Sequence, residues 1–176
     1  MNIQLELLGI GKLLAEEWGA SVSDVVIAAL LHDIGKSMTK QEMLSLCVRN
    51  NITIYDFELF ENLTALHGKV SAMLFEQEFK GNDKKRIELI SHAILSHSAG
   101  DINMNIIDKI VYISDNLDLK EESKELLKQI KSGQIYNPDY YVREITKQKI
   151  QRSKNRGDYQ YNPLLDAIMS EEETER

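Results

Sequence analysis

A histidine and an aspartate stand side by side, as His32 and Asp33, at the end of an apolar run. An aspartate is almost never fully buried unless it is paired or bound to a metal, and the histidine beside it offers a second ligand atom. Among the later residues of these two types, His67, His97 and Asp115 are candidates for the same site. Because the chain has only four histidines, this set indicates a metal-dependent hydrolase.

A mixed set of imidazoles and carboxylates suits iron, manganese, zinc or similar ions better than calcium, which prefers oxygen ligands. Neighbouring residues of a helix point about 100° apart, so His32 and Asp33 cannot lie flat on one helix face. They can flank a common point between helices, and the two oxygens of a carboxylate can bridge two metals. Helical bundles build metal sites in this way, from single side chains of several facing helices.

Each of these residues has an ordinary interpretation when it is taken alone. His67 and His97 would more often be core or surface histidines, and Asp115 would more often be a helix cap or a surface acid. Lys36 is either a solvated cation at a helix end or, one turn after the His-Asp pair, a phosphate ligand. His92 lies about 140° around the helix from the histidine five residues later, so we expect it to point elsewhere.

The composition is that of a soluble globular protein, and 176 residues can bury one good core. A net charge of −7 argues against a nucleic-acid or anionic-membrane surface, although bound divalent metals could still attract a phosphorylated substrate. No apolar stretch approaches the ~20 residues of a membrane span, and no signal-peptide pattern opens the chain, so a cytoplasmic location is expected. Cys47 is the only cysteine and is expected to be a buried, unreactive thiol.

Apolar residues recur at intervals of three and four, which is typical of helices, and no segment reads as a convincing strand. Thr39 and Glu42 have the spacing of a capping box, and Pro138 stands at an early helical position. The predicted helices lie close to residues 5–18, 24–33, 40–48, 55–60, 66–79, 83–97, 105–113, 120–131 and 138–150, with a last short one from 163. We therefore predict one all-α domain over 1–169, with a disordered acidic tail at 170–176.

The order His-Asp, His, His, Asp occurs here in the settings LLHDIGK (30–36), LHG (66–68), HSAG (97–100) and NIIDKIVYISD (105–115). This pattern resembles the HD-domain phosphohydrolases, and within them the YqeK-type symmetrical bis(5′-nucleosyl)-tetraphosphatases of bacteria. The resemblance extends over roughly residues 3–118. It implies an HD-domain helical bundle with a dinuclear site for divalent metal, iron before manganese or zinc.

The resemblance also implies a role for each residue. Asp33 would bridge the two metals, His32 and Asp115 would bind one of them, and His67 and His97 would bind the other. Lys36 would bind phosphate and serve catalysis together with Asp33. Ser98 and Gly100, in the turn after the last histidine, would lie near the nucleotide.

Two features depart from the family pattern. The family carries another histidine on its first helix, where this chain has Ile3, and no histidine precedes His32. The segment 116–120 lacks the proline and the arginine expected around the nucleotide pocket. The first departure bears on whether one or two ions are bound, and the second bears on the identity of the substrate.

The leading interpretation is hydrolysis of diadenosine tetraphosphate to two ADP by a metal-bound hydroxide, because metal binding brings the pKa of water near neutrality. One alternative is the same chemistry on another nucleotide or phosphoester. A second is a degenerate HD domain that binds a nucleotide or a protein partner without turnover, and the missing histidine favours it. The expected partner is thus a small nucleotide, and the sequence leaves open whether the chain forms a homodimer.

Overall fold

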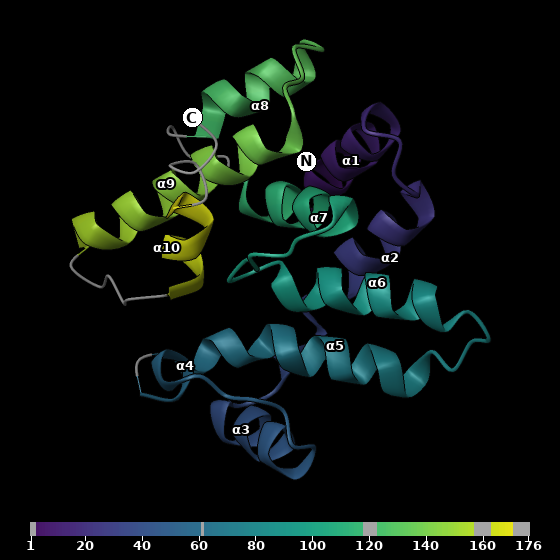
Figure 1. The fold of residues 1–176 in the computed structure, drawn as a ribbon, viewed down its shortest axis with the longest axis vertical. Helices are drawn as coiled ribbons and strands as arrows, with labels where there is room; N and C mark the ends of the chain where they lie inside the picture. Colours follow the sequence, from purple (N-terminus) through teal and green to yellow (C-terminus); the bar gives the residue numbers. More distant parts are fainter. Residues whose placement is uncertain (1–2, 61, 118–122, 157–162, 171–176) are drawn as a thin grey trace.

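A computed structural model describes residues 3–60, 62–117, 123–156 and 163–170 of the chain. Every regular element in these ranges is a helix and none is a strand, which confirms the predicted all-α class (Figure 1). The elements in chain order are α1 (Ile3–Glu17), α2 (Val22–Leu31), the 3₁₀ turn η1 (Ile34–Ser37), α3 (Lys40–Arg49), α4 (Asp56–Phe60), the 3₁₀ turn η2 (Leu63–Ala65), α5 (Leu66–Glu78), α6 (Lys84–Ser96), α7 (Ile106–Asn116), α8 (Lys124–Lys131), α9 (Pro138–Arg156) and α10 (Pro163–Ser170). Across the described ranges, no helix has both the length and the apolar content that a membrane span requires.

Local capping signals explain where two of the helices begin. Thr39 and Glu42 form the predicted capping box of α3, in which each side chain accepts a hydrogen bond from the backbone N–H of the other. Asn105 and Asp108 form a second capping box at the start of α7. Such side chains satisfy backbone N–H groups that the first helical turn leaves unpaired, so they stop the helix from starting elsewhere.

The C-terminal part of the chain differs from the prediction in one respect. The helix expected to end near Ile150 continues through Arg156 as α9. Residues 151–156 contain neither glycine nor proline, so nothing in this stretch breaks the helix. The predicted tail after Ser170 and the first residues of the helix predicted at 120–131 lie outside the described residues.

Helix α7 lies at the centre of the main core, where it packs against α1, α2, α6 and α9 (Figure 1). Its fully buried side chains include Ile110, Tyr112 and Ile113. A second, smaller core lies where α3 packs on α5, and the buried Cys47 belongs to it, as predicted. Helix α5 also packs against α6, so α5 contributes buried side chains to both cores. The ends of these packed helices position the candidate site.

Candidate metal centre

The side chains of the His-Asp pair reach the same point because helix α2 ends just before them. Leu31 is the last residue of α2, and Asp33 has φ −106° and ψ 5°, outside the helical region. On the helix predicted from the sequence, His32 and Asp33 would point about 100° apart, whereas in the structure the helix ends between the apolar run and the pair. This break turns the Asp33 carboxylate toward the ring of His32, so that Asp33 Oδ2 lies 3.3 Å from His32 Nε2.

The other three predicted ligands come from the ends of three further helices. His67 is the second residue of α5, His97 follows the last residue of α6, and Asp115 is the penultimate residue of α7. A residue at a helix end can project past its own helix into the space between helices. The structure therefore brings all five side chains together from four separate segments of the chain.

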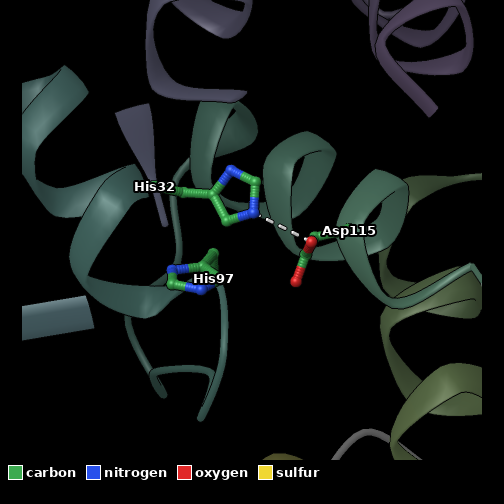
Figure 2. A group of neighbouring side chains, drawn as sticks. All are labelled: His32, His97 and Asp115. Atoms are coloured by element: carbon green, nitrogen blue, oxygen red, sulfur yellow. Dashed lines mark ion pairs between the residues drawn. The ribbon is translucent and has the colours of Figure 1, made fainter. Parts of the chain in front are cut away.

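Two overlapping groups make up this cluster. In the first, His32 Nε2 lies 3.0 Å from Asp115 Oδ1, and His97 completes the group (Figure 2). In the second, Asp33 Oδ1 lies 3.4 Å from His67 Nε2 and 3.6 Å from His97 Nε2. His97 belongs to both groups, whereas the family resemblance assigns it to one ion only. The ligand roles of the five residues stay predictions.

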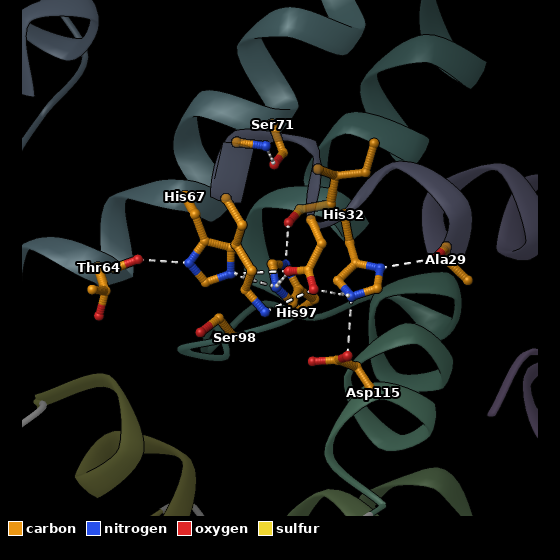
Figure 3. A network of polar contacts seen from close by, with 12 residues as sticks. Ala29, His32, Thr64, His67, Ser71, His97, Ser98 and Asp115 are labelled. Carbon is orange, nitrogen blue, oxygen red and sulfur yellow. Dashed lines mark hydrogen bonds and ion pairs between the residues drawn. The ribbon is translucent and has the colours of Figure 1, made fainter. Parts of the chain in front are cut away.

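The three histidines share one arrangement that fixes which ring nitrogen carries the hydrogen in the neutral form. Each Nδ1 lies at hydrogen-bond distance from the backbone carbonyl three residues earlier, and a carbonyl can only accept, so Nδ1 carries the hydrogen. The pairs are His32 with Ala29 (2.8 Å), His67 with Thr64 (2.6 Å) and His97 with Ile94 (2.7 Å). In the neutral rings Nε2 is then a free lone pair, and all three Nε2 atoms face the crevice (Figure 3).

Two contacts in the cluster call for a positive charge between the side chains. The Nε2 atoms of His67 and His97 are 2.9 Å apart, so their lone pairs repel unless a proton or a cation lies between them. Asp33 Oδ1 is buried and has no hydrogen-bond partner among the described residues. Three imidazoles and two carboxylates that converge in this way fit a divalent transition-metal ion, as the mixed ligand set predicts.

Electrostatics hold the two carboxylates ionised. Burial alone would raise the pKa of Asp33, but its close contacts with three histidines and with Lys36 lower that pKa far below its usual range. Burial also works against ionisation of Asp115, whose pKa is nevertheless lowered by the adjacent His32. Both side chains are therefore anionic at neutral pH and can bind a cation directly.

The histidines respond differently to the same surroundings. Burial lowers the pKa of His97 and outweighs the nearby carboxylates, so this ring is neutral at pH 7. Burial would also lower the pKa of His32, but hydrogen bonds with Asp115 and Asp33 raise it to about 10. In the metal-free protein a proton on His32 thus occupies the direction in which a metal would bind.

The predicted substrate-binding residues divide into two groups. Lys36 and Ser98 line a cavity of about 510 Å³, and His67 lines it as well. Lys36 Nζ lies 2.7 Å from Asp33 Oδ2. Gly100 does not line this cavity. It is buried in the turn after α6, with φ +76°, and packs against Ile168. The substrate roles of these three residues stay predictions.

His92 points away from the cluster, as expected from its position on the helix. Its Nδ1 lies 2.7 Å from Oδ2 of Asp108, which is fully buried at the start of α7. The hydrogen bond to Asp108 is the main reason that the pKa of His92 is raised. This pair joins α6 to α7 without taking part in the candidate site.

A raised pKa in the folded state makes the contribution of His92 to stability depend on pH. It is fully present below the unfolded pKa of about 6.5 and is lost as pH rises through the folded pKa. We therefore expect the Tm difference between the wild type and His92→Gln to be larger at pH 6 than at pH 9, in thermal unfolding with a chelator present. A difference that grows with pH would contradict the assigned pair.

The structure places two residues beside the cluster that are not predicted from the sequence, Asn116 and Lys149. Asn116 Nδ2 donates to the backbone oxygen of His97, and Lys149 Nζ donates to Asn116 Oδ1. Asn116 follows a predicted ligand directly, which is a weak signal. Lys149 is one of several lysines on α9, 51 residues after its contact Ser98, and nothing in its local sequence marks it.

Comparison with known families agrees with the class that the fold and the cluster define. Residues 4–120, well over half of the chain, match the family model described as the HD domain. The chain therefore belongs to the HD-domain family. The matched region holds all five members of the cluster, whereas α9 and α10 lie outside it.

Two curated relatives are each described as "Bis(5'-nucleosyl)-tetraphosphatase, symmetrical". The protein from Bacillus subtilis (strain 168) is 30% identical over 118 residues, which cover 67% of this chain and 56% of the relative. The protein from Halalkalibacterium halodurans is 30% identical over 105 residues, which cover 60% of this chain and 53% of the relative. The chain thus spans about half the length of the curated relatives it matches.

A solved structure shows that the fold is shared over nearly the whole chain. It is the crystal structure of a predicted HD superfamily hydrolase involved in NAD metabolism from Clostridium acetobutylicum. The TM-score is 0.80 at 20% identity, and the match covers 96% of this chain and 88% of the other. The likeness therefore includes helices beyond residue 120.

Proposed function

We propose that this chain is a metal-dependent phosphohydrolase of nucleotide phosphoanhydrides, and that its substrate is a dinucleoside tetraphosphate cleaved symmetrically. The observation that carries the proposal is the orientation of the three histidines, whose Nε2 atoms converge on two carboxylates while their Nδ1 atoms are held by backbone carbonyls. The packing of a hydrophobic core does not require this convergence, whereas a divalent-metal site requires it.

His32, Asp33, His67, His97 and Asp115 would hold the metal. When bound, a divalent ion lowers the pKa of water and neutralises charge on phosphoryl oxygens. The Asp33 carboxylate, already ionised, faces both halves of the cluster and is suited to a bridging role. Its neighbour Lys36 carries a half-exposed ammonium beside the cavity and can bind a phosphate oxygen.

The cavity beside His67 supports a nucleotide as the ligand. About 510 Å³ lies within the range of small-ligand pockets and is suited to one nucleotide unit. Its wall combines the cations Lys36 and Lys40 with the apolar side chains of Met38 and Met43. The cations suit phosphates, and the methionines suit the face of a base. The names of the two curated relatives support the choice of a dinucleoside tetraphosphate.

The direct test is to incubate metal-freed protein with diadenosine tetraphosphate, alone and with Fe²⁺ or Mn²⁺, and to separate the nucleotides formed. We expect ADP as the only product, formed only with added metal. ATP together with AMP would contradict symmetrical cleavage. No turnover with either ion would contradict the enzymatic proposal.

Replacement of Lys36 with alanine should weaken phosphate binding and leave the metal content unchanged. A hydrogen bond to a charged group contributes about 1.5–3 kcal/mol, so kcat/KM should fall roughly 10–100-fold. Steady-state kinetics and metal analysis of the same preparation measure the two quantities. Lys147→Ala, which removes an exposed lysine paired with Glu144, is the control. Loss of metal from Lys36→Ala would contradict its assignment to phosphate.

A second candidate function is a degenerate HD domain that binds a nucleotide without turnover. The observation in its favour is Ile3, which stands where the family has a histidine. Ile3 is the first residue of α1, and its side chain lies outside the described residues. Activity with metal decides between the two candidates.

The isoleucine at position 3, in place of a histidine, also predicts how many metal ions the protein binds. With one ligand fewer, one of the two metal positions should bind weakly, because loss of even an outer partner of a ligand costs about 10–100-fold in affinity. We expect nearer one ion than two per chain in protein purified without chelator, measured by elemental analysis. Two tightly bound ions would show that another group takes the place of the missing histidine.

A further inference from the structure

One lysine outside the family-matched region reaches the edge of the candidate metal centre. Lys149 lies on α9, which packs along α7 (Figure 1). Its Nζ donates to the backbone oxygen of Ser98 at 2.5 Å and to Asn116 Oδ1 at 2.7 Å, and it lies 5.0 Å from the ring centroid of Tyr112. Burial lowers the pKa of Lys149 to about 8. Lys149 is half-buried, and its ammonium contacts groups of two other segments.

Both oxygens that accept from Lys149 belong to residues next to predicted ligands. Ser98 directly follows His97, and Asn116 directly follows Asp115. Asn116 also donates through Nδ2 to the backbone oxygen of His97 at 2.8 Å. A continuous chain of hydrogen bonds therefore joins α9 to the end of α7 and to the end of α6, the two segments that meet in the group of Figure 2.

A lysine is an unfavourable choice for packing alone. An ammonium taken out of water loses hydration, and two neutral oxygens replace only part of it, so an apolar side chain would stabilise the same position at lower cost. What a lysine supplies is three donors on one atom and a positive charge. Here the donors join two backbone segments, and the charge lies close enough to Asp115 to interact with that carboxylate.

The turn after His97 is held from a second side by the C-terminal helix. Gly100 has φ +76°, and a Cβ there would lie 2.6 Å from Cδ1 of Ile168 on α10. The backbone of residues 97–100 is therefore enclosed between α9, α10 and α7. Both C-terminal helices therefore contact the turn that directly follows His97.

We propose that Lys149 is a positioning residue of the metal centre, which sets the spacing between His97 and Asp115 by binding Ser98 and Asn116. This inference rests on the proposed metal centre and extends it beyond residues 4–120. Groups that orient metal ligands without touching the ion typically contribute 10–100-fold to metal affinity. The region after residue 120 thereby becomes part of the site.

The test is a calorimetric titration of metal-freed protein with Mn²⁺ alone, with thermal unfolding in chelator measured in parallel. Lys149→Met should bind Mn²⁺ 10–100-fold more weakly than the wild type. Thr146→Val is the matched control: it lies on the same helix, and its hydroxyl bonds to Tyr112 of α7 at 3.0 Å and to a backbone carbonyl. It touches neither Ser98 nor Asn116, so it should lower the Tm and leave Mn²⁺ affinity within threefold of the wild type.

Asn116→Ser is an independent test, because it removes the side chain that bonds both to Lys149 and to the backbone oxygen of His97. Its effect on Mn²⁺ affinity should be less than additive with that of Lys149→Met, as expected for residues of one hydrogen-bond network. If Lys149→Met does not fold, Lys149→Gln and Asn116→Ser decide by the same 10-fold criterion.

Two results would overturn the inference while leaving the metal centre in place. One is wild-type Mn²⁺ affinity in Lys149→Met, and the other is an equal loss of affinity in Thr146→Val, which would assign the effect to general docking of α9. Failure of the wild type to bind Mn²⁺ would overturn the metal centre itself and this inference with it. Failure to hydrolyse a dinucleoside tetraphosphate, with Mn²⁺ bound, bears only on the substrate.

Discussion

Replacement of Asp33 with alanine is expected to abolish hydrolysis and to remove most of the bound metal in the same protein. The Asp33 carboxylate contacts histidines of both groups in the cluster, so its loss weakens every metal position that the cluster can form. The fall in affinity should exceed the 10–100-fold that is typical of residues behind the ligands. Elemental analysis and a hydrolysis assay on the same preparation measure both effects.

The stability of Asp33→Ala separates a metal role from a structural one. Metal stabilises the folded state by mass action, so the Tm difference from the wild type should shrink when a chelator is added to both proteins. Asp139→Ala, which removes a half-exposed carboxylate paired with Lys109, should leave activity and metal content unchanged. Full activity in Asp33→Ala would refute the proposed mechanism.

Replacement of Gly35 with alanine is expected to disturb the same site through packing alone. Gly35 follows the His-Asp pair in η1, and an added Cβ would lie 2.6 Å from the backbone oxygen of His67 and 3.1 Å from Ser71 Oγ. A backbone oxygen cannot rotate away, so η1 and α5 must separate. Overpacking of this kind costs about 1–3 kcal/mol, which lowers the Tm by roughly 3–10 °C in a chain of this size.

The separation should also reach the candidate metal site, because Asp33 directly precedes η1 and α5 carries His67. We therefore expect Gly35→Ala to bind Mn²⁺ more weakly than the wild type even at temperatures where it is fully folded. Gly9→Ala is the matched control, since a Cβ at this exposed helical glycine meets nothing within 4 Å. That variant should be slightly more stable, by about 0.5–1 kcal/mol. Equal Tm and equal metal affinity in Gly35→Ala would contradict the close approach of η1 to α5.

The sequence by itself determined the helical class, the start of α3 and the residue types of the candidate site. The capping box of Thr39 and Glu42 is a local signal, because its hydrogen bonds join residues only three apart. The outward direction of His92 also followed from helical periodicity. The same local reasoning failed at Arg152–Arg156, where a polar stretch without glycine or proline continues the helix.

Only the tertiary structure decided how those residues act together. Three features of the site depend on how distant helices pack. Helix α2 ends before Asp33, His97 belongs to both groups of the cluster, and Lys149 contacts Ser98, which lies 51 residues earlier. Such contacts carry no local signal, because the free energy that holds Lys149 beside Ser98 comes from docking α9 on α7 and not from its own sequence neighbours. Periodicity and capping act within a few residues, whereas the geometry of a site is set by interactions between segments far apart in the chain.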